Sequence, residues 1–259
     1  MSDDLFSVKG KRVLVTGGTS GIGRMLVQGL AERGARVYTC SRKPELVQRM
    51  VEELRAKGLD VAGSGCNVAD TSEVDALVAR VSQHFGGALD VLVNNAGATW
   101  GAPLEKYPMD GWDKVFDLNV RGLFYVSQHC VDMLEAGAKA SGEPSRIIHV
   151  GSIAGFIQPD DNAWAYHASK AAVHHLGRTM AKTLAARSIL VNSLAPGVFP
   201  SKMTTHMLPG GDDSMMASVI PLKRVGRPDD LVGAVVYLAS RAGSYVTGSV
   251  LTVGGGIQL

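Results

Sequence analysis

Short apolar runs alternate with longer amphipathic stretches along the whole chain of 259 residues. The apolar runs have the length and composition of buried strands, and the stretches between them have helical spacing. The predicted strands are 12–17, 35–41, 60–68, 89–97, 145–152, 189–197 and 248–256. The predicted helices are 21–34, 44–58, 72–86, a long helical zone at about 111–137, 163–187 and 228–240. Because helices of this length act as crossovers, we expect an α/β fold with a doubly wound, seven-stranded parallel sheet covered by helices on both faces.

The chain shows no internal division. No linker, repeat or low-complexity segment interrupts the alternation, so a single domain over residues 1–259 is expected. The segment at about 198–220 contains proline, paired glycines and an acidic pair without clear periodicity. Such a stretch is typical of a mobile loop on a compact domain, and we expect it to border the substrate.

The composition excludes several classes of protein. Hydrophobic residues make up 46% and charged residues 19% of the chain, and the net charge of +2 favours neither nucleic acid nor a membrane surface as a partner. The three cysteines have no paired spacing, so the sequence predicts neither disulfides nor a metal site. No apolar run approaches the roughly 20 residues of a membrane span, and the first residues lack a signal segment. These features favour a cytoplasmic protein.

A glycine-rich loop joins the first predicted strand to the first predicted helix. The stretch "VTGGTSGIG" places Gly17, Gly21 and Gly23 at this junction. Glycines here let the backbone turn tightly and approach a pyrophosphate, which then lies at the helix N-terminus. A tight turn without a ligand would use the same residues, but the position in the first strand–helix unit favours a dinucleotide.

The end of the second predicted strand indicates which dinucleotide the chain would bind. An acid at this point commonly holds the ribose hydroxyls of NAD, whereas an arginine accommodates the 2′-phosphate of NADP. The sequence here is "YTCSRK", with Ser41, Arg42 and Lys43 and no acid. A guanidinium beside a hydroxyl suits a phosphate, so the sequence favours NADP over the alternative of a solvated basic turn.

The stretch "YHASK" carries Tyr166 and Lys170 one helical turn apart. Most pairs of this kind are solvated surface pairs. A nearby ammonium, however, favours the phenolate over the phenol, which makes the tyrosine able to exchange a proton with a substrate oxygen. Ser152, at the end of the fifth strand, could hydrogen-bond the same oxygen.

Together these motifs resemble the short-chain dehydrogenase/reductase family over essentially the whole chain. The matching stretches are "TGGTSGIG", "NNAG" at 94–97, "LNV" with Asn119, "VGS" with Ser152, "YHASK" and "PGVFPSKM" at 196–203. The resemblance implies a Rossmann fold, a catalytic tetrad and a homo-oligomer of two or four copies. In the implied tetrad, Tyr166 exchanges the proton, Ser152 stabilises the oxygen, Lys170 also binds the nicotinamide ribose, and Asn119 holds a water that links Lys170 to solvent.

The resemblance also implies a set of NADP(H) contacts. They are Gly17, Thr19, Ser20, Gly21, Ile22, Gly23, Ser41, Arg42, Asn67, Val68, Asn95, Ala96, Gly97, Tyr166, Lys170, Pro196, Gly197, Val198, Ser201 and Met203. The chain departs from the family pattern at three of its positions. Asn67 replaces an aspartate near the adenine, Ser201 replaces a threonine, and Gly254 replaces the acid of a common C-terminal motif.

Local stretches around the site are similar to reductases of the rhamnolipid-associated 3-oxoacyl type. The expected substrate-side residues are mainly apolar: Trp100, Phe156, Ile157, Trp164, Phe199, Met203 and Met207. They favour a 3-oxoacyl thioester or another apolar ketone as the substrate. An NAD(H)-dependent sugar, polyol or hydroxysteroid dehydrogenase is the alternative, and a non-catalytic NADP(H)-binding sensor is a further one. His167, His174 and His175 lack carboxylates at a suitable spacing and are expected to take no part in the chemistry.

Overall fold

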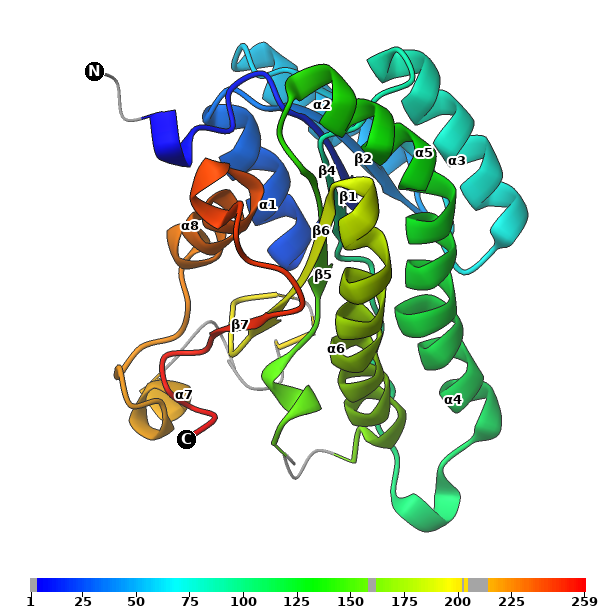
Figure 1. Cartoon of the computed structure of the whole chain (residues 1–259). Helices are drawn as coiled ribbons and strands as arrows, with labels where there is room; N and C mark the ends of the chain where they lie inside the picture. Colours follow the sequence, from blue (N-terminus) through cyan, green and yellow to red (C-terminus); the bar gives the residue numbers. More distant parts are fainter. Residues whose placement is uncertain (1–3, 158–161, 202, 205–213) are drawn as a thin grey trace.

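A computed structural model describes residues 4–157, 162–201, 203–204 and 214–259 of the chain. Seven strands within these ranges form one sheet in the order β3-β2-β1-β4-β5-β6-β7. Every pair of neighbouring strands is parallel. Helices cover both faces of the sheet (Figure 1). The predicted doubly wound α/β fold is therefore confirmed.

The elements follow the predicted alternation closely. The strands are β1 (Arg12–Thr16), β2 (Arg36–Ser41), β3 (Val61–Gly65), β4 (Val91–Asn94), β5 (Ser145–Val150), β6 (Ile189–Pro196) and β7 (Val250–Val253). The α-helices are α1 (Gly21–Glu32), α2 (Pro44–Ala56), α3 (Thr71–Phe85), α4 (Met109–Phe116), α5 (Leu123–Ser141), α6 (Trp164–Leu184), α7 (Ser214–Val219) and α8 (Pro228–Ala239). No helix among the described residues is both long enough and apolar enough to cross a membrane.

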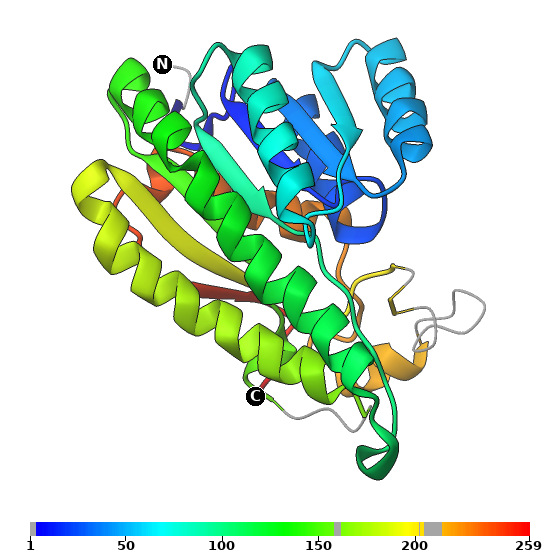
Figure 2. The same ribbon diagram turned by 90° about the vertical axis from the view of Figure 1, so that its right-hand side faces the viewer.

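Two buried cores lie on opposite faces of the sheet. Val13 and Val15 of β1 join the core beneath α1, α2 and α8, whereas Leu14 joins the core beneath α3, α5 and α6. Because successive side chains of a strand point to opposite faces, one apolar strand supplies both cores. The two helical layers are seen on either side of the sheet in Figures 1 and 2.

Two regions differ from the sequence-based prediction. The long helical zone at 111–137 is divided, because π-helical turns over Asp117–Gly122 separate α4 from α5. A side chain at Gly122 would lie 2.3 Å from the carbonyl oxygen of Val68, so this wide turn closely approaches the segment that follows β3. The segment at about 198–220 contains the unpredicted helix α7, while residues 205–213, including Met207, lie outside the described residues.

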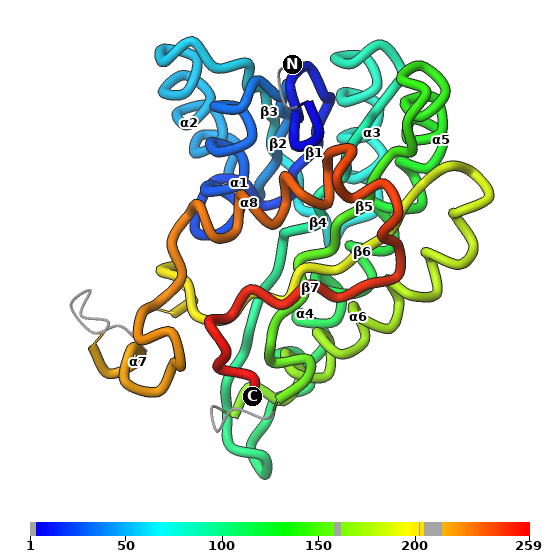
Figure 3. The backbone as a smooth tube through the Cα atoms, turned by 60° about the vertical axis from the view of Figure 1, so that its left-hand side comes forward, coloured from blue at the N-terminus to red at the C-terminus, as the bar shows by residue number. Residues whose placement is uncertain are grey.

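The order of the strands determines where a ligand can bind. The chain moves outward from β1 to β3 and then returns to place β4 on the other side of β1. The connections after β1 and β4 therefore leave in opposite directions, which opens a crevice at the carboxyl ends of these strands. Figure 3 shows β1, β4, β5 and β6 in this order across the sheet.

Candidate active site

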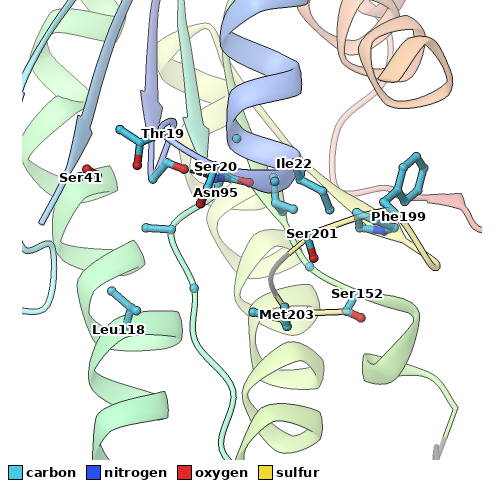
Figure 4. A pocket seen from close by; sticks show the side chains of 18 of the residues that line it. Thr19, Ser20, Ile22, Ser41, Asn95, Leu118, Ser152, Phe199, Ser201 and Met203 are labelled. Atoms are coloured by element: carbon cyan, nitrogen blue, oxygen red, sulfur yellow. Dashed lines mark hydrogen bonds between the residues drawn. The ribbon is translucent and has the colours of Figure 1, made fainter. Parts of the chain in front are cut away.

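A cavity of about 360 Å³ lies at this edge of the sheet. Most predicted cofactor and catalytic residues line it: Gly17, Thr19, Ser20, Gly21, Ile22, Gly23, Ser41, Arg42, Val68, Asn95, Ala96, Gly97, Ser152, Tyr166, Lys170, Pro196, Gly197, Ser201 and Met203. Figure 4 shows side chains from the glycine loop, from the π-helical turns and from the segment after β6 around the same space. The tertiary structure thus gathers residues from across the chain.

The glycine loop is shaped by close backbone contacts. Gly17 has a φ of +70°, a conformation that favours glycine, and its amide donates to the Cys40 carbonyl oxygen at 2.8 Å. A side chain at Gly23 would lie 2.2 Å from the Gly17 carbonyl oxygen. The two glycines are therefore required for the tight junction between β1 and α1.

Asn95, directly after β4, holds this loop in place. Its side-chain amide donates to the carbonyl oxygens of Thr16 at 2.8 Å and Gly17 at 3.1 Å. The Thr16 hydroxyl in turn accepts from the amides of Asn95 and Ala96. These bonds join the ends of β1 and β4, so Asn95 supports the loop as well as lining the cavity.

The cavity fits a phosphorylated dinucleotide. Ser20 is the N-cap of α1 but makes no side-chain cap hydrogen bond, which leaves first-turn amides available to a phosphate. The charged residues that line the cavity within the described part of the chain are Arg42 and Lys170, both cations. A lining with two cations and no carboxylate suits an anionic ligand.

Lys170 is buried beside Tyr166. Its ammonium lies 5.5 Å from the centre of the Tyr166 ring and donates to the Val150 carbonyl oxygen at 2.8 Å. Burial lowers the pKa of Lys170 from 10.5 to about 8. The amine still carries its proton on most molecules at neutral pH, so a positive charge faces the phenol.

Asn119 lies behind the cavity rather than on its surface. Its side-chain oxygen accepts from the Ala98 amide at 2.8 Å, and its amide donates to the Ala98 carbonyl at 3.0 Å and to Ser169 at 2.9 Å. A side chain at Gly97 would contact both the Asn119 oxygen, at 3.3 Å, and the Lys170 amine, at 3.7 Å. Asn119 therefore lies close to Lys170, and its role in holding a water stays a prediction.

Ser152 follows β5 and is the N-cap of the short 3-10 helix Ile153–Gly155. Its hydroxyl accepts from the Ala154 amide at 3.1 Å, and its own amide donates to Nε2 of His174 at 3.4 Å. Ser152 and Tyr166 both line the cavity. Each carries a hydroxyl group, which can hydrogen-bond an oxygen atom of a ligand.

Two predicted cofactor contacts do not line the cavity. Val198 is buried in a separate small core with Ile220 and Val225. The Asn67 side chain accepts from the Ala69 amide, within its own turn, while Cys66 and Val68 on either side line the cavity. Direct contact of Asn67 with the adenine therefore stays a prediction. Gly254, another of the three departures from the family pattern, packs against Gly197: a side chain at Gly197 would lie 2.7 Å from the Cα atom of Gly254.

Several lining residues were not predicted as cofactor contacts. They are Cys66, Leu118, Val150, Gly151, Phe199 and Thr204. Leu118 precedes Asn119 on the π-helical turns, a geometry that periodicity does not reveal. Thr204 donates to the Phe199 carbonyl at 2.6 Å and accepts from the Ser201 amide at 3.0 Å. It closes the turn at which Ser201 faces the glycine loop.

Comparison with known proteins agrees with this geometry. A family model of short-chain dehydrogenases, described as "Enoyl-(Acyl carrier protein) reductase", matches residues 17–258. The chain belongs to the short-chain dehydrogenase/reductase family. The predicted family and its class of activity, oxidoreduction, are thereby confirmed.

Individual members of the short-chain dehydrogenase/reductase family match the chain almost from end to end. The rhamnolipids biosynthesis 3-oxoacyl-[acyl-carrier-protein] reductase of Pseudomonas aeruginosa is 43% identical over 261 residues, which cover 98% of both chains. The 3-oxoacyl-[acyl-carrier-protein] reductase FabG of Staphylococcus aureus is 38% identical over 96% of this chain and 98% of its own. A solved Pseudomonas aeruginosa structure, the RhlG/NADP active-site complex, has a TM-score of 0.92 and 41% identity over 99% of each chain.

The side chains at the cavity determine which chemistry the short-chain dehydrogenase/reductase site can perform. Among the described residues, no group of three or more His, Cys, Asp or Glu side chains is placed to hold a metal ion. The hydroxyls of Ser152 and Tyr166 and the amine of Lys170 are among the groups at the cavity that can exchange a proton. Acid–base chemistry at a substrate oxygen is therefore the chemistry that these residues can perform.

Proposed function

We propose that the protein is an NADP(H)-dependent reductase of 3-oxoacyl thioesters. The observation that carries the proposal is the placement of Ser152, Tyr166 and Lys170 on the same cavity as the glycine loop and Arg42. One end of the cavity can hold the phosphates of a dinucleotide, and the other presents proton donors to a carbonyl. The names of the matched relatives point to a 3-oxoacyl group as the substrate class.

NADP(H) is the cofactor in this proposal, and it supplies the hydride. The first-turn amides of α1 would hold the pyrophosphate, and the side chains of Ser41 and Arg42 would hold the 2′-phosphate. The NADP complex of the matched Pseudomonas aeruginosa structure supports this choice, as does the cationic lining. Lys170 would bind the ribose next to the nicotinamide.

Tyr166 acts as the general acid during reduction. Its phenol hydroxyl donates a proton to the substrate oxygen, and the phenolate that remains is stabilised by the nearby Lys170 ammonium. The Ser152 hydroxyl donates a hydrogen bond to the same oxygen and stabilises the negative charge that develops there. In the oxidation direction the Tyr166 phenolate takes the proton back.

Part of the cavity lining is apolar. Leu118, Phe199 and Met203 belong to it, and the exposed rings of Phe156 and Trp164 lie on segments next to Ser152 and Tyr166. Apolar walls suit an acyl chain, with the ketone held at Ser152 and Tyr166. An NAD(H)-dependent sugar, polyol or hydroxysteroid dehydrogenase is less well supported, because no acid lines the cavity among the described residues to hold ribose hydroxyls.

A chain-length series tests the proposal. NADPH oxidation should be measured with 3-oxoacyl thioesters of several lengths and with a hydroxysteroid ketone and a sugar ketone. Tyr166→Phe should lower kcat at least about a hundredfold, since the lost proton transfer contributes a factor of this order. Tyr245→Phe is the matched control, because that ring is fully exposed. Equal turnover by wild type and Tyr166→Phe would refute the tyrosine mechanism, and faster turnover of the sugar or steroid ketone would refute the substrate class.

The predicted homo-oligomer, mobile loop and cytoplasmic location stay predictions. Sedimentation of the purified protein distinguishes a monomer from a dimer or tetramer.

A further inference from the structure

His174 lies on the same face of α6 as the catalytic pair. Tyr166, Lys170 and His174 follow one another at intervals of four residues, so their side chains are stacked along one side of the helix. The His174 side chain is buried, with 3% of its surface exposed, although the sequence predicted no part for it in the site. The third member of the row is thus directed toward the protein interior beside the cavity.

The His174 imidazole fills a slot in the loop that carries Ser152. Nε2 of the ring accepts from the Ser152 amide at 3.4 Å. A side chain at Gly151 would lie 2.2 Å from Nε2, and one at Gly155 would lie 2.7 Å from Cε1. The ring also packs on Phe156, with 4.5 Å between ring centres and 32° between their planes. A single side chain therefore contacts the loop before, at and after Ser152.

The hydrogen bond requires a neutral imidazole. Nε2 can accept only when it carries no proton, which places the proton of the neutral ring on Nδ1. Burial, together with the charges of Lys170 and Arg178, lowers the pKa of His174 to about 4, so the ring is neutral at pH 7. Nε2 is therefore available as an acceptor throughout the neutral range.

The other ring nitrogen makes a purely structural role harder to explain. Nδ1 of His174 is buried and has no hydrogen-bond partner among the described residues. An unsatisfied buried polar atom costs free energy, and an apolar side chain of similar size would fill the slot without that cost. The ring nitrogen Nε2 gives the Ser152 amide an acceptor that an apolar side chain would lack.

We propose that His174 is a positioning residue for the reduction: it fixes the backbone of Ser152 so that the serine hydroxyl faces the substrate oxygen. The inference rests on the proposed function, in which Ser152 contacts that oxygen. His174 itself contacts neither the substrate nor the cofactor. Its effect should therefore appear in turnover and should depend on the presence of the Ser152 hydroxyl.

Three variants separate positioning from packing. His174→Leu fills the slot without an acceptor, and His174→Gln offers an amide oxygen close to the position of Nε2. We expect His174→Leu to lower kcat about tenfold with little change in the Kd of NADPH, and His174→Gln to recover most of that loss. His175→Leu, on the exposed neighbour, is the control and should leave kcat unchanged. A His174→Gln variant as slow as His174→Leu would overturn the proposal.

A double-mutant cycle supplies the decisive measurement. If His174 acts through Ser152, then His174→Leu should slow the Ser152→Ala enzyme by less than twofold, because no serine hydroxyl remains to be placed. A further tenfold loss in the Ser152→Ala background would show an independent, structural effect and overturn the inference. A wild-type enzyme that reduces no ketone would instead refute the proposed function. If the wild-type enzyme is active and the effects of His174→Leu and Ser152→Ala are additive, only the positioning role of His174 is refuted.

Discussion

Arg42 and Lys170 are the two charged side chains that line the cavity within the described residues, and they serve different parts of the proposed ligand. Arg42 is exposed at the end of β2, where a guanidinium can bind a phosphate without a large desolvation cost. Lys170 is buried, so its charge acts on Tyr166 across a short, poorly screened distance. In the proposed function, a positive charge thus supports cofactor binding at one end of the cavity, and another supports proton transfer at the other end.

Replacing Arg42 tests the choice of cofactor. Arg42→Ala should raise the KM for NADPH at least about tenfold, since charge-assisted bonds to a phosphate contribute roughly 1.5–3 kcal/mol. The KM for NADH, which lacks the 2′-phosphate, should change little. Lys43→Ala is the matched control, because Lys43 is exposed and lies outside the cavity lining. Steady-state kinetics with both cofactors measure the difference, and an unchanged preference in Arg42→Ala would contradict the assignment.

At the scale of secondary-structure elements, the contact between helices α1 and α8 depends on the small residue Gly29. A side chain at Gly29 of α1 would lie 2.4 Å from a methyl group of Val232 on α8. Gly233, the next residue after Val232 on α8, is exposed. A side chain added at Gly233 would have no other atom within 4 Å. The two glycines therefore differ in packing, although both lie in helices.

This difference predicts opposite effects on stability. Gly29→Ala should lower the free energy of unfolding by about 1–3 kcal/mol, because the added methyl group overpacks the contact between α1 and α8. Gly233→Ala should raise it by roughly 0.5–1 kcal/mol, because alanine restricts the unfolded chain and favours a helix. Urea denaturation of both variants provides the comparison. A stabilised Gly29→Ala protein would show that the two helices can separate without cost.

At the scale of the whole molecule, two buried histidines make the stability depend on pH. Burial and the charge of Lys170 lower the pKa of His149 to about 3, and the pKa of His174 is about 4, against an ordinary value of 6.5. Between these values the unfolded chain binds protons that the folded chain does not. The free energy of unfolding is therefore expected to fall as the pH drops from about 6.5 toward 4, and this contribution is constant above about 6.5.

Urea denaturation between pH 7.5 and 4.5 checks this expectation. His174→Gln removes one of the two titrating rings, so its stability should decline less steeply with falling pH than that of the wild type. Identical slopes for wild type and His174→Gln would mean that His174 is already protonated in the folded protein at mildly acidic pH.

Sequence reasoning predicted the strands and most helices because their signals are local. Apolar runs and helical spacing depend only on neighbouring residues, and Gly17 and Gly23 stand at a junction that their position in the chain reveals. The π-helical turns at Asp117–Gly122 were missed, because apolar periodicity does not distinguish them from the α-helix on either side. Helix α7, of six residues, was missed because it is too short for a periodic pattern.

The amino-acid sequence by itself determined the parallel sheet, the glycine loop between β1 and α1, and the chemical groups of the site. These follow from the order of strands and helices and from motifs whose residue types match one chemistry. Only the tertiary structure decided that His174 contacts Ser152, that Asn119 lies behind Gly97 and that Asn67 lies outside the cavity lining. Such contacts join residues far apart along the chain, and their geometry depends on how the helices pack on the sheet.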